Sequence, residues 1–295
     1  MKPLLVRLTL AGAISLMALS LQAQPTAHYV PGAEGIKGAS LPPPGWYVRD
    51  YNIAYTADRV NDGKGKSAGP PNYDAFIYAN VPRVIYITET KFLGGFVGVD
   101  ALLPFVYQSV RAGGFNESTF GIGDLFAEAT LSWHIPRFDF SLGSGVWTPT
   151  GNSERPPTTR VGAGYWTPML TAGATWYMDT EKTWAVSALN RYEFNTEQRD
   201  THVTPGQAYT LEWGVGYAPC KVAEFGVVGY FQQQTTDNSP SGFLSSKDHV
   251  VAVGPEISAV CPKLGLITSL RYLYEVSAAS RLQGQTVTLT FTKRF

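Results

Sequence analysis

The sequence is poor in charged residues and in histidine. Asp, Glu, Lys and Arg make up 16% of its 295 residues, whereas an ordinary soluble domain carries about 25%. The 23 basic and 23 acidic residues balance, so neither nucleic acid nor another strongly charged partner is expected. The four histidines, His28, His134, His202 and His249, lack the spacing of metal ligands. We therefore expect no metal and no cofactor.

Long apolar runs are also missing after residue 23. The best candidate, residues 94–107, is interrupted by Asp100 and Pro104, and no run of 18 apolar residues occurs. A transmembrane helix needs about 20 such residues. The sequence therefore predicts no membrane-spanning helix in this part of the chain.

The first 23 residues follow a different pattern. Lys2 and Arg7 precede an apolar stretch over residues 8–21, which is typical of a secretory signal peptide. We expect export and cleavage after Ala23. Removal of residues 1–23 leaves 21 basic and 23 acidic residues, a net charge of −2.

Aromatic residues are abundant, with 16 Tyr, 7 Trp and a total of 13%. Tyrosine and tryptophan in excess suit a protein that crosses two membrane interfaces. Carbohydrate-binding sandwiches are rich in aromatic residues as well. Composition alone leaves both classes open.

Two segments alternate apolar and polar side chains with the period of a β-strand. In residues 124–135, Leu125, Ala127, Ala129, Leu131, Trp133 and Ile135 share one face, and Asp124, Glu128, Thr130, Ser132 and His134 share the other. In the last ten residues, Val287, Leu289 and Phe291 alternate with four threonines. Membrane barrels and soluble sandwiches both alternate in this way.

The lengths of the connections separate the two architectures. The same period predicts twelve strands, over residues 45–56, 81–90, 95–108, 124–135, 138–148, 165–178, 184–195, 208–218, 222–233, 248–260, 264–276 and 285–295. Long connections at 57–80, 109–123, 149–164, 196–207, 234–247 and 277–284 alternate with short ones at 91–94, 136–137, 179–183, 219–221 and 261–263. The sequence therefore predicts an all-β fold, a 12-stranded antiparallel transmembrane β-barrel with short periplasmic turns and longer extracellular loops, in the outer membrane of a Gram-negative bacterium.

An even number of strands places both ends of the barrel at the periplasmic rim. We expect the last strand to pair beside the strand that begins at Gly45, which closes the barrel and leaves no edge. The ending T-F-T-K-R-F resembles the C-terminal signal of bacterial outer-membrane barrels. That resemblance implies that the barrel-assembly machinery recognises Phe291 and Phe295.

Residues 24–44 precede the barrel and are rich in Pro and Gly without a strand period. We predict a periplasmic or plug segment here, and a disordered leader is the alternative.

The two cysteines, Cys220 and Cys261, lie in predicted periplasmic turns separated by one hairpin. A disulfide between them and two unpaired thiols are both open.

Charged side chains recur at positions of the predicted strands that share the parity of Glu128. This parity turns ten residues toward the lumen: Asp100, Asp124, Glu128, His134, Arg191, Glu193, Glu212, Glu256, Arg271 and Glu275. An arginine facing lipid at the midplane would cost about 2–4 kcal/mol, which favours the inward placement. These residues either form a constriction that selects solutes or a structural network of ion pairs.

Several short motifs resemble a known family. They are His28-Tyr29, Glu34-Gly35, Leu41-Pro42-Pro43-Pro44-Gly45, Arg49-Asp50-Tyr51-Asn52, Gly121-Ile122-Gly123-Asp124, Thr148-Pro149-Thr150-Gly151 and Gly164-Tyr165. The chain resembles an outer-membrane family linked to the meta-pathway of phenol degradation, which includes a sphingosine-induced outer-membrane protein. The resemblance implies a transporter for hydrophobic or amphipathic small molecules, such as aromatic compounds or sphingoid bases.

One pair of residues suggests an enzyme. Ser132 and His134 lie two apart on one strand face, as a histidine-activated serine requires, but no third residue that would orient the histidine is identifiable. We therefore predict a channel without catalytic residues, whose partners are outer-membrane lipid and a small hydrophobic or aromatic solute. The alternatives are a structural or interaction barrel with a filled lumen and, less favoured, an outer-membrane lipid hydrolase.

Overall fold

A computed structural model describes residues 27–152, 160–240 and 246–295 of the chain. The predicted signal peptide, residues 1–23, lies outside the described residues. Fourteen strands account for most of the described residues. They are β1 (Gly45–Val60), β2 (Asp74–Phe92), β3 (Gly95–Leu102), β4 (Phe105–Ala112), β5 (Phe115–Ile122), β6 (Phe126–Ile135), β7 (Phe138–Trp147), β8 (Thr167–Tyr177), β9 (Trp184–Glu193), β10 (Ala208–Cys220), β11 (Ala223–Gln234), β12 (His249–Cys261), β13 (Leu266–Ala279) and β14 (Leu282–Arg294).

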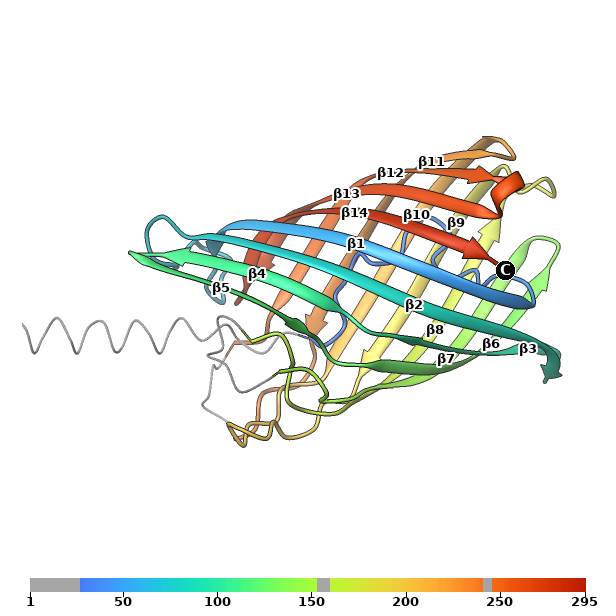
Figure 1. Ribbon diagram of the computed structural model, residues 1–295. Coiled ribbons are helices and arrows are strands. Elements are labelled where there is room, and N and C mark those ends of the chain that lie inside the picture. Colours follow the sequence, from blue (N-terminus) through green and yellow to red (C-terminus); the bar gives the residue numbers. More distant parts are fainter. Residues whose placement is uncertain (1–26, 153–159, 241–245) are drawn as a thin grey trace, which may run out of the picture.

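Twelve of these strands form a closed antiparallel ring, as predicted (Figure 1). The order runs from β1 through β2, β3 and β6 to β14, and β14 pairs with β1 from Tyr47↔Arg294 to Val60↔Leu282. The backbone N–H of Phe295 donates to the carbonyl oxygen of Trp46 at 3.0 Å, which extends the pairing to the last residue. The ring therefore has no open edge.

Strands β4 and β5 form a hairpin outside the ring, where a loop over residues 109–123 was predicted. This prediction was wrong. β2 is 19 residues long, and it pairs with β3 along its second half and with β4 along its first half. Pro104 separates β3 from β4, and the turn between β4 and β5 is Gly113-Gly114, whose positive φ angles of 56° and 93° suit glycine. In Figure 1 this hairpin extends beyond the ring at the end opposite the C-terminus.

Short turns lie at one end of the barrel, together with the C-terminus (Figure 1). The opposite end carries the connections 61–73, 148–166, 194–207 and 235–248. One prediction fails here, because β13 and β14 are joined only by Ser280 and Arg281 instead of a loop over 277–284. Ser280 adopts a positive φ of 56°, which allows this tight turn. The end with the short turns is the periplasmic one in outer-membrane barrels.

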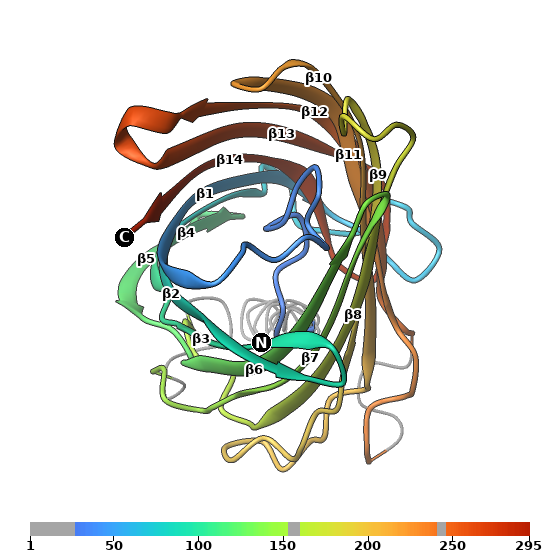
Figure 2. The same ribbon diagram turned by 90° about the vertical axis from the view of Figure 1, so that its right-hand side faces the viewer.

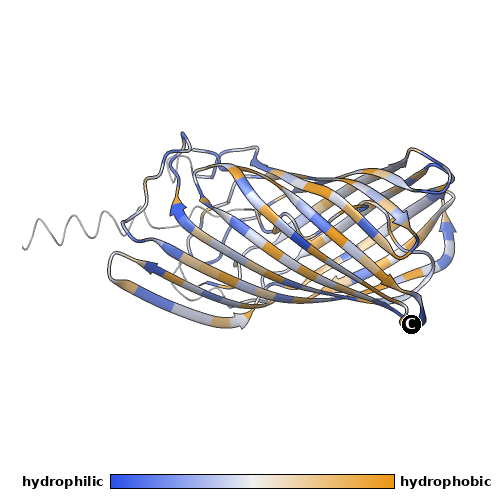
Figure 3. Ribbon diagram, turned by 90° about the horizontal axis from the view of Figure 1, so that it is seen from above, coloured by the Kyte–Doolittle hydropathy of each residue, from blue (hydrophilic) through white to orange (hydrophobic). Residues whose placement is uncertain are grey.

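Hydrophobic and hydrophilic residues alternate along the strands (Figure 3). In β14, Val287 and Phe291 are 43% and 37% exposed, whereas the threonines between them are almost fully buried in the lumen. The outside is thus apolar and the lumen polar, as expected for an outer-membrane barrel. Among the described residues, no helix is long and apolar enough to cross a membrane.

The lumen is occupied by the chain itself. Residues 28–44, called the inner segment below, lie inside the ring of strands (Figure 2). Ala39 is completely buried there, and Ile36 packs against an apolar cluster that includes Val228 and Tyr230. The interior of the barrel is therefore formed by strand side chains and by this segment together.

Candidate functional site

The inner segment runs along the lumen from one end to the other. At its beginning, His28 Nδ1 lies 3.2 Å from Thr167 Oγ1 on β8, close to the end of the barrel with the long connections. At its end, Pro44 leads directly into β1 at the periplasmic rim. A contact between the segment and the wall is therefore present at each level of the barrel.

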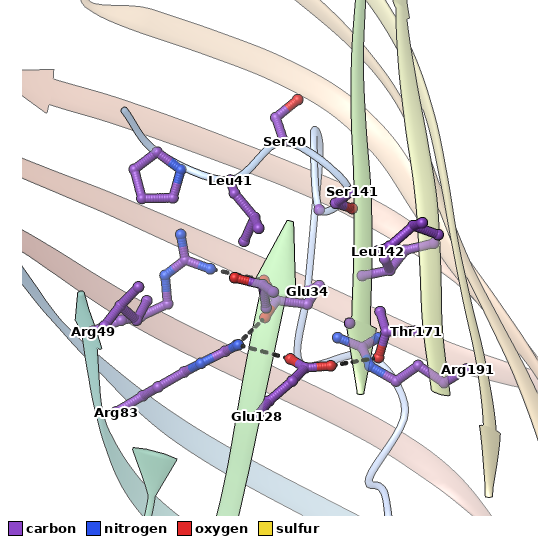
Figure 4. A pocket seen from close by; sticks show the side chains of 16 residues that line it. Glu34, Ser40, Leu41, Arg49, Arg83, Glu128, Ser141, Leu142, Thr171 and Arg191 are labelled. Atoms are coloured by element: carbon purple, nitrogen blue, oxygen red, sulfur yellow. Dashed lines mark hydrogen bonds and ion pairs between the residues drawn. The ribbon is translucent and has the colours of Figure 1, made fainter. Parts of the chain in front are cut away.

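Glu34 attaches the middle of the segment to β1 and β2 (Figure 4). Its carboxylate lies 2.9 Å from Arg49 Nη1 and 3.1 Å from Arg83 Nη1, and it accepts a hydrogen bond from the Tyr51 hydroxyl at 2.7 Å. Burial alone would raise the pKa of Glu34, but the two guanidinium groups outweigh it and lower the pKa from 4.5 to about 2. Glu34 is therefore ionised at neutral pH.

Glu212 on β10 holds the first half of the segment. Its Oε1 atom accepts the backbone N–H groups of Gly32 at 2.8 Å and Glu34 at 3.1 Å, and its Oε2 atom accepts the Tyr29 hydroxyl at 2.7 Å. Arg191 on β9 forms an ion pair with the same carboxylate and lies over the Tyr29 ring, 4.1 Å from its centroid. One wall carboxylate thus satisfies two backbone donors that would otherwise be buried without a partner.

Glu256 on β12 and Arg271 on β13 form a third attachment. Glu256 Oε2 accepts the backbone N–H of Ile36 at 2.8 Å, and Arg271 Nη1 donates to the carbonyl oxygen of Gly32 at 2.6 Å. A Cβ atom on Gly35 would lie 1.9 Å from Glu256 Oε2. Only glycine lets the segment approach the wall this closely.

Little free volume remains beside these contacts. The cavity lined by Glu34, Arg83, Glu128 and Arg191 measures about 30 Å³. That volume holds one or two water molecules and no organic solute. The inner segment therefore fills the lumen at this level.

The ten residues predicted to face the lumen come from six strands and one connection. Nine are buried: Asp100, Asp124, Glu128, Arg191, Glu193, Glu212, Glu256, Arg271 and Glu275. Their partners differ, because Asp100 pairs with Arg83 within the wall whereas Glu193, Glu212 and Glu256 bond to the inner segment. His134 is exposed near the periplasmic turn and lies 3.0 Å from Asp139.

Ser132 and His134 do not form a catalytic pair among the contacts of the described residues. His134 Nδ1 bonds to Asp139, and the buried Ser132 hydroxyl has no hydrogen-bond partner there. Within the part of the chain that the structure describes, no three His, Cys, Asp or Glu side chains are grouped as metal ligands.

The two cysteines are both free and exposed at the periplasmic rim, so of the two alternatives the structure has the unpaired thiols. Cys220 ends β10 and Cys261 ends β12, with β11 between them. Two strand spacings amount to about 10 Å, more than the Cα separation of about 7 Å that a disulfide tolerates.

Sequence reasoning missed Glu34, Arg49 and Arg83 as site residues. Arg83 was identifiable, because it lies in the predicted strand over residues 81–90 and an arginine facing lipid at the midplane would cost about 2–4 kcal/mol. Glu34 was not, since it lies outside any strand and only the fold brings it to Arg83, 49 residues away.

The comparisons with known proteins fit this architecture. Residues 57–291 match the family model described as "Putative MetA-pathway of phenol degradation". The outer membrane channel of Pseudomonas putida F1 superimposes with a TM-score of 0.77 at 14% identity, over 91% of this chain and 100% of that one. The β-domain of the Bordetella autotransporter BrkA gives a TM-score of 0.52 at 13% identity, over 85% and 99%. No curated protein sequence matches. Because this family model matches most of the length of the chain, the chain belongs to the phenol-degradation MetA-pathway family.

Proposed function

We propose that the protein is an outer-membrane channel for uptake of small hydrophobic or amphipathic molecules, and that residues 28–44 are its plug. One observation carries the proposal: the lumen is filled by a separate segment and not by the side chains of the wall alone. Among the described residues, that segment contacts the wall through hydrogen bonds and ion pairs. The segment can therefore leave the lumen without breaking the ring of strands.

The family suggests the class of solute. Its description refers to phenol degradation, and a fold relative is described as an outer membrane channel. Aromatic compounds are accordingly the first candidates, and sphingoid bases the second. A channel of this kind needs no catalytic group and no cofactor, because its solute moves down a concentration gradient.

A structural barrel with a permanently filled lumen is the second candidate. The tight packing around Glu34 favours it, because the remaining cavity holds only about 30 Å³. The two candidates differ in whether the inner segment ever leaves.

Single-channel recording in planar bilayers separates them. We expect the full-length protein to be closed with brief openings, and a variant lacking residues 24–44 to remain open. A closed deletion variant, refolded as judged by its heat-modifiable gel mobility, would support the structural barrel.

Uptake measured in cells without this protein tests the solute class. We expect slower uptake of phenol or sphingosine and unchanged uptake of a small sugar. Equal rates for all solutes with and without the protein would contradict the proposal.

A further inference from the structure

The outer end of the inner segment lies in a box of aromatic side chains. The imidazole ring of His28 stacks on the indole of Trp147, with 4.8 Å between the ring centroids and 17° between the planes. Tyr165 contacts the same imidazole edge-on at 5.4 Å. Phe126 and Met169 complete the apolar lining as part of the buried cluster that contains Trp147. The box thus encloses one planar ring.

The box also has polar groups at the edge of that ring. His28 Nε2 lies 3.0 Å from Asp124 Oδ2, and His28 Nδ1 lies 3.2 Å from Thr167 Oγ1. Asp124 accepts two further hydrogen bonds, from the backbone N–H groups of Gly151 at 2.7 Å and Ala163 at 2.6 Å. These two bonds hold the carboxylate in place independently of His28. The acceptor therefore remains oriented toward the box when the imidazole leaves.

The motifs behind the family resemblance meet at this box. Residues 28–29, 121–124, 148–151 and 164–165 are distant in sequence, yet His28, Asp124, Gly151 and Tyr165 make contact here. A barrel wall does not require this combination of stacked aromatic rings and an oriented carboxylate. The indole Nε1–H of Trp147 is buried, with the side chain only 6% exposed, and it has no acceptor among the described residues. A buried donor without a partner is unusual in a folded protein, so this indole keeps the capacity for a further hydrogen bond.

His28 belongs to the inner segment and not to the wall, as does Tyr29, a further member of the buried cluster. Trp147, Phe126, Met169 and Thr167 lie on strands β6 to β8, which stay fixed in the ring. The imidazole is thus a removable occupant of a site whose walls are permanent.

We propose that this box binds a small planar aromatic ring carrying a neutral hydroxyl group, and that His28 competes with this solute for the box. The inference rests on the proposed channel function and adds an entry site to it. The aromatic ring takes the position of the imidazole between Trp147 and Tyr165, and the hydroxyl donates to Asp124. Binding of the solute thus releases the outer end of the plug.

The chemistry of the box sets its selectivity. Cyclohexanol keeps the hydroxyl but loses the stacking on Trp147, and toluene keeps the ring but loses the donor to Asp124. Benzoate carries a negative charge, which the carboxylate of Asp124 repels. Phenol should therefore bind better than all three.

Binding of these four probes to the full-length protein in detergent, measured by equilibrium dialysis, tests the proposal. Removal of the competitor in His28→Ala should tighten phenol binding on the order of tenfold, because more of the protein is then competent to bind. Any probe that occupies the box should gain by the same factor, so selectivity is measured by the order of the four affinities in His28→Ala, with phenol the tightest. An unchanged phenol affinity, or cyclohexanol, toluene or benzoate binding as tightly as phenol, would overturn the proposal.

A second measurement observes the box directly. With 5-fluorotryptophan incorporated, the ¹⁹F resonance of Trp147 is assigned by its absence in Trp147→Phe, and phenol should shift it in His28→Ala at lower concentrations than in the unmodified protein. A Trp147 resonance that does not respond to phenol overturns the site even if phenol uptake depends on this protein. A responding resonance supports the site even if uptake fails, so the two proposals can fail separately.

Discussion

The carboxylate of Glu34 lies 2.9 Å from Nη1 of Arg49, so the inner segment forms an ion pair with the first strand of the wall. The Glu34 side chain is 8% exposed, and Arg83 approaches it from the neighbouring strand. A buried carboxylate is stable only with such partners. The closed state of the lumen therefore depends on charges that lie 15 and 49 residues apart in the sequence.

Replacing Glu34 by Gln should favour the open lumen. The substitution leaves Arg49 and Arg83 without their shared partner, and removal of one member of a buried ion pair typically costs about 3–5 kcal/mol. Because the ring of strands retains its own hydrogen bonds, we expect this cost to appear as release of the segment. Single-channel open probability should rise strongly, and Glu89→Gln, an exposed glutamate on β2, should leave it unchanged. An open probability equal in the two variants would contradict this role of Glu34.

Acid should open the lumen through the same residue. The pKa of Glu34 is lowered from 4.5 to about 2 in the closed state, so its ionised form stabilises closure fully above pH 4.5. That contribution is lost as the pH falls from 4.5 toward 2. Open probability should be constant between about pH 7 and 5 and rise below about pH 4. In Glu34→Gln the channel should already be open at pH 7, and an equal acid response in both proteins would assign the effect to another group.

Much of the fold could be predicted because each strand of a membrane barrel alternates lipid-facing and lumen-facing residues, a pattern that is visible within the strand's own sequence. Alternation alone distinguished lipid-facing Val287 and Phe291 from the lumen-facing threonines. The lengths of the connections showed at which end of the barrel each strand begins and ends. Contacts across the lumen could not be predicted in this way. Glu212 meets the backbone of Gly32 only because the ring closes around the segment, and no period in the sequence encodes that.

The prediction for the β4–β5 hairpin was wrong for a different reason. The predicted strand over residues 95–108 runs through Pro104, where the structure separates β3 from β4, and the rest of β4 and all of β5 were assigned to a loop over residues 109–123. The Gly113-Gly114 dipeptide is a recognised signal for a tight hairpin, and it was the observation that would have identified β4 and β5.

Deletion of Phe295 should reduce assembly without destabilising the folded barrel. Phe295 is 75% exposed, and its backbone hydrogen bond to Trp46 is a small part of the β1–β14 pairing. We expect a lower amount of protein in the outer membrane, measured on heated and unheated gels, and a normal unfolding transition after refolding in detergent. Lys293→Gln serves as the control on the same strand. Normal outer-membrane levels of the truncated protein would exclude Phe295 from the assembly signal.

Two buried threonines should respond oppositely to replacement by valine. The Thr288 hydroxyl on β14 has no hydrogen-bond partner among the described residues, so Thr288→Val removes an unsatisfied polar group and should stabilise the barrel by up to about 1 kcal/mol. Thr210 on β10 is equally buried, but its Oγ1 accepts a hydrogen bond from Gln232 Nε2 at 3.0 Å. Thr210→Val should therefore destabilise the barrel by about 1–3 kcal/mol, because one N–H of Gln232 Nε2 loses its acceptor while the other keeps the carbonyl oxygen of Tyr29. Urea unfolding from lipid vesicles, followed by tryptophan fluorescence, measures both changes. Equal destabilisation by the two substitutions would show that the Thr288 hydroxyl has a partner in the lumen, such as an ordered water, that valine cannot replace.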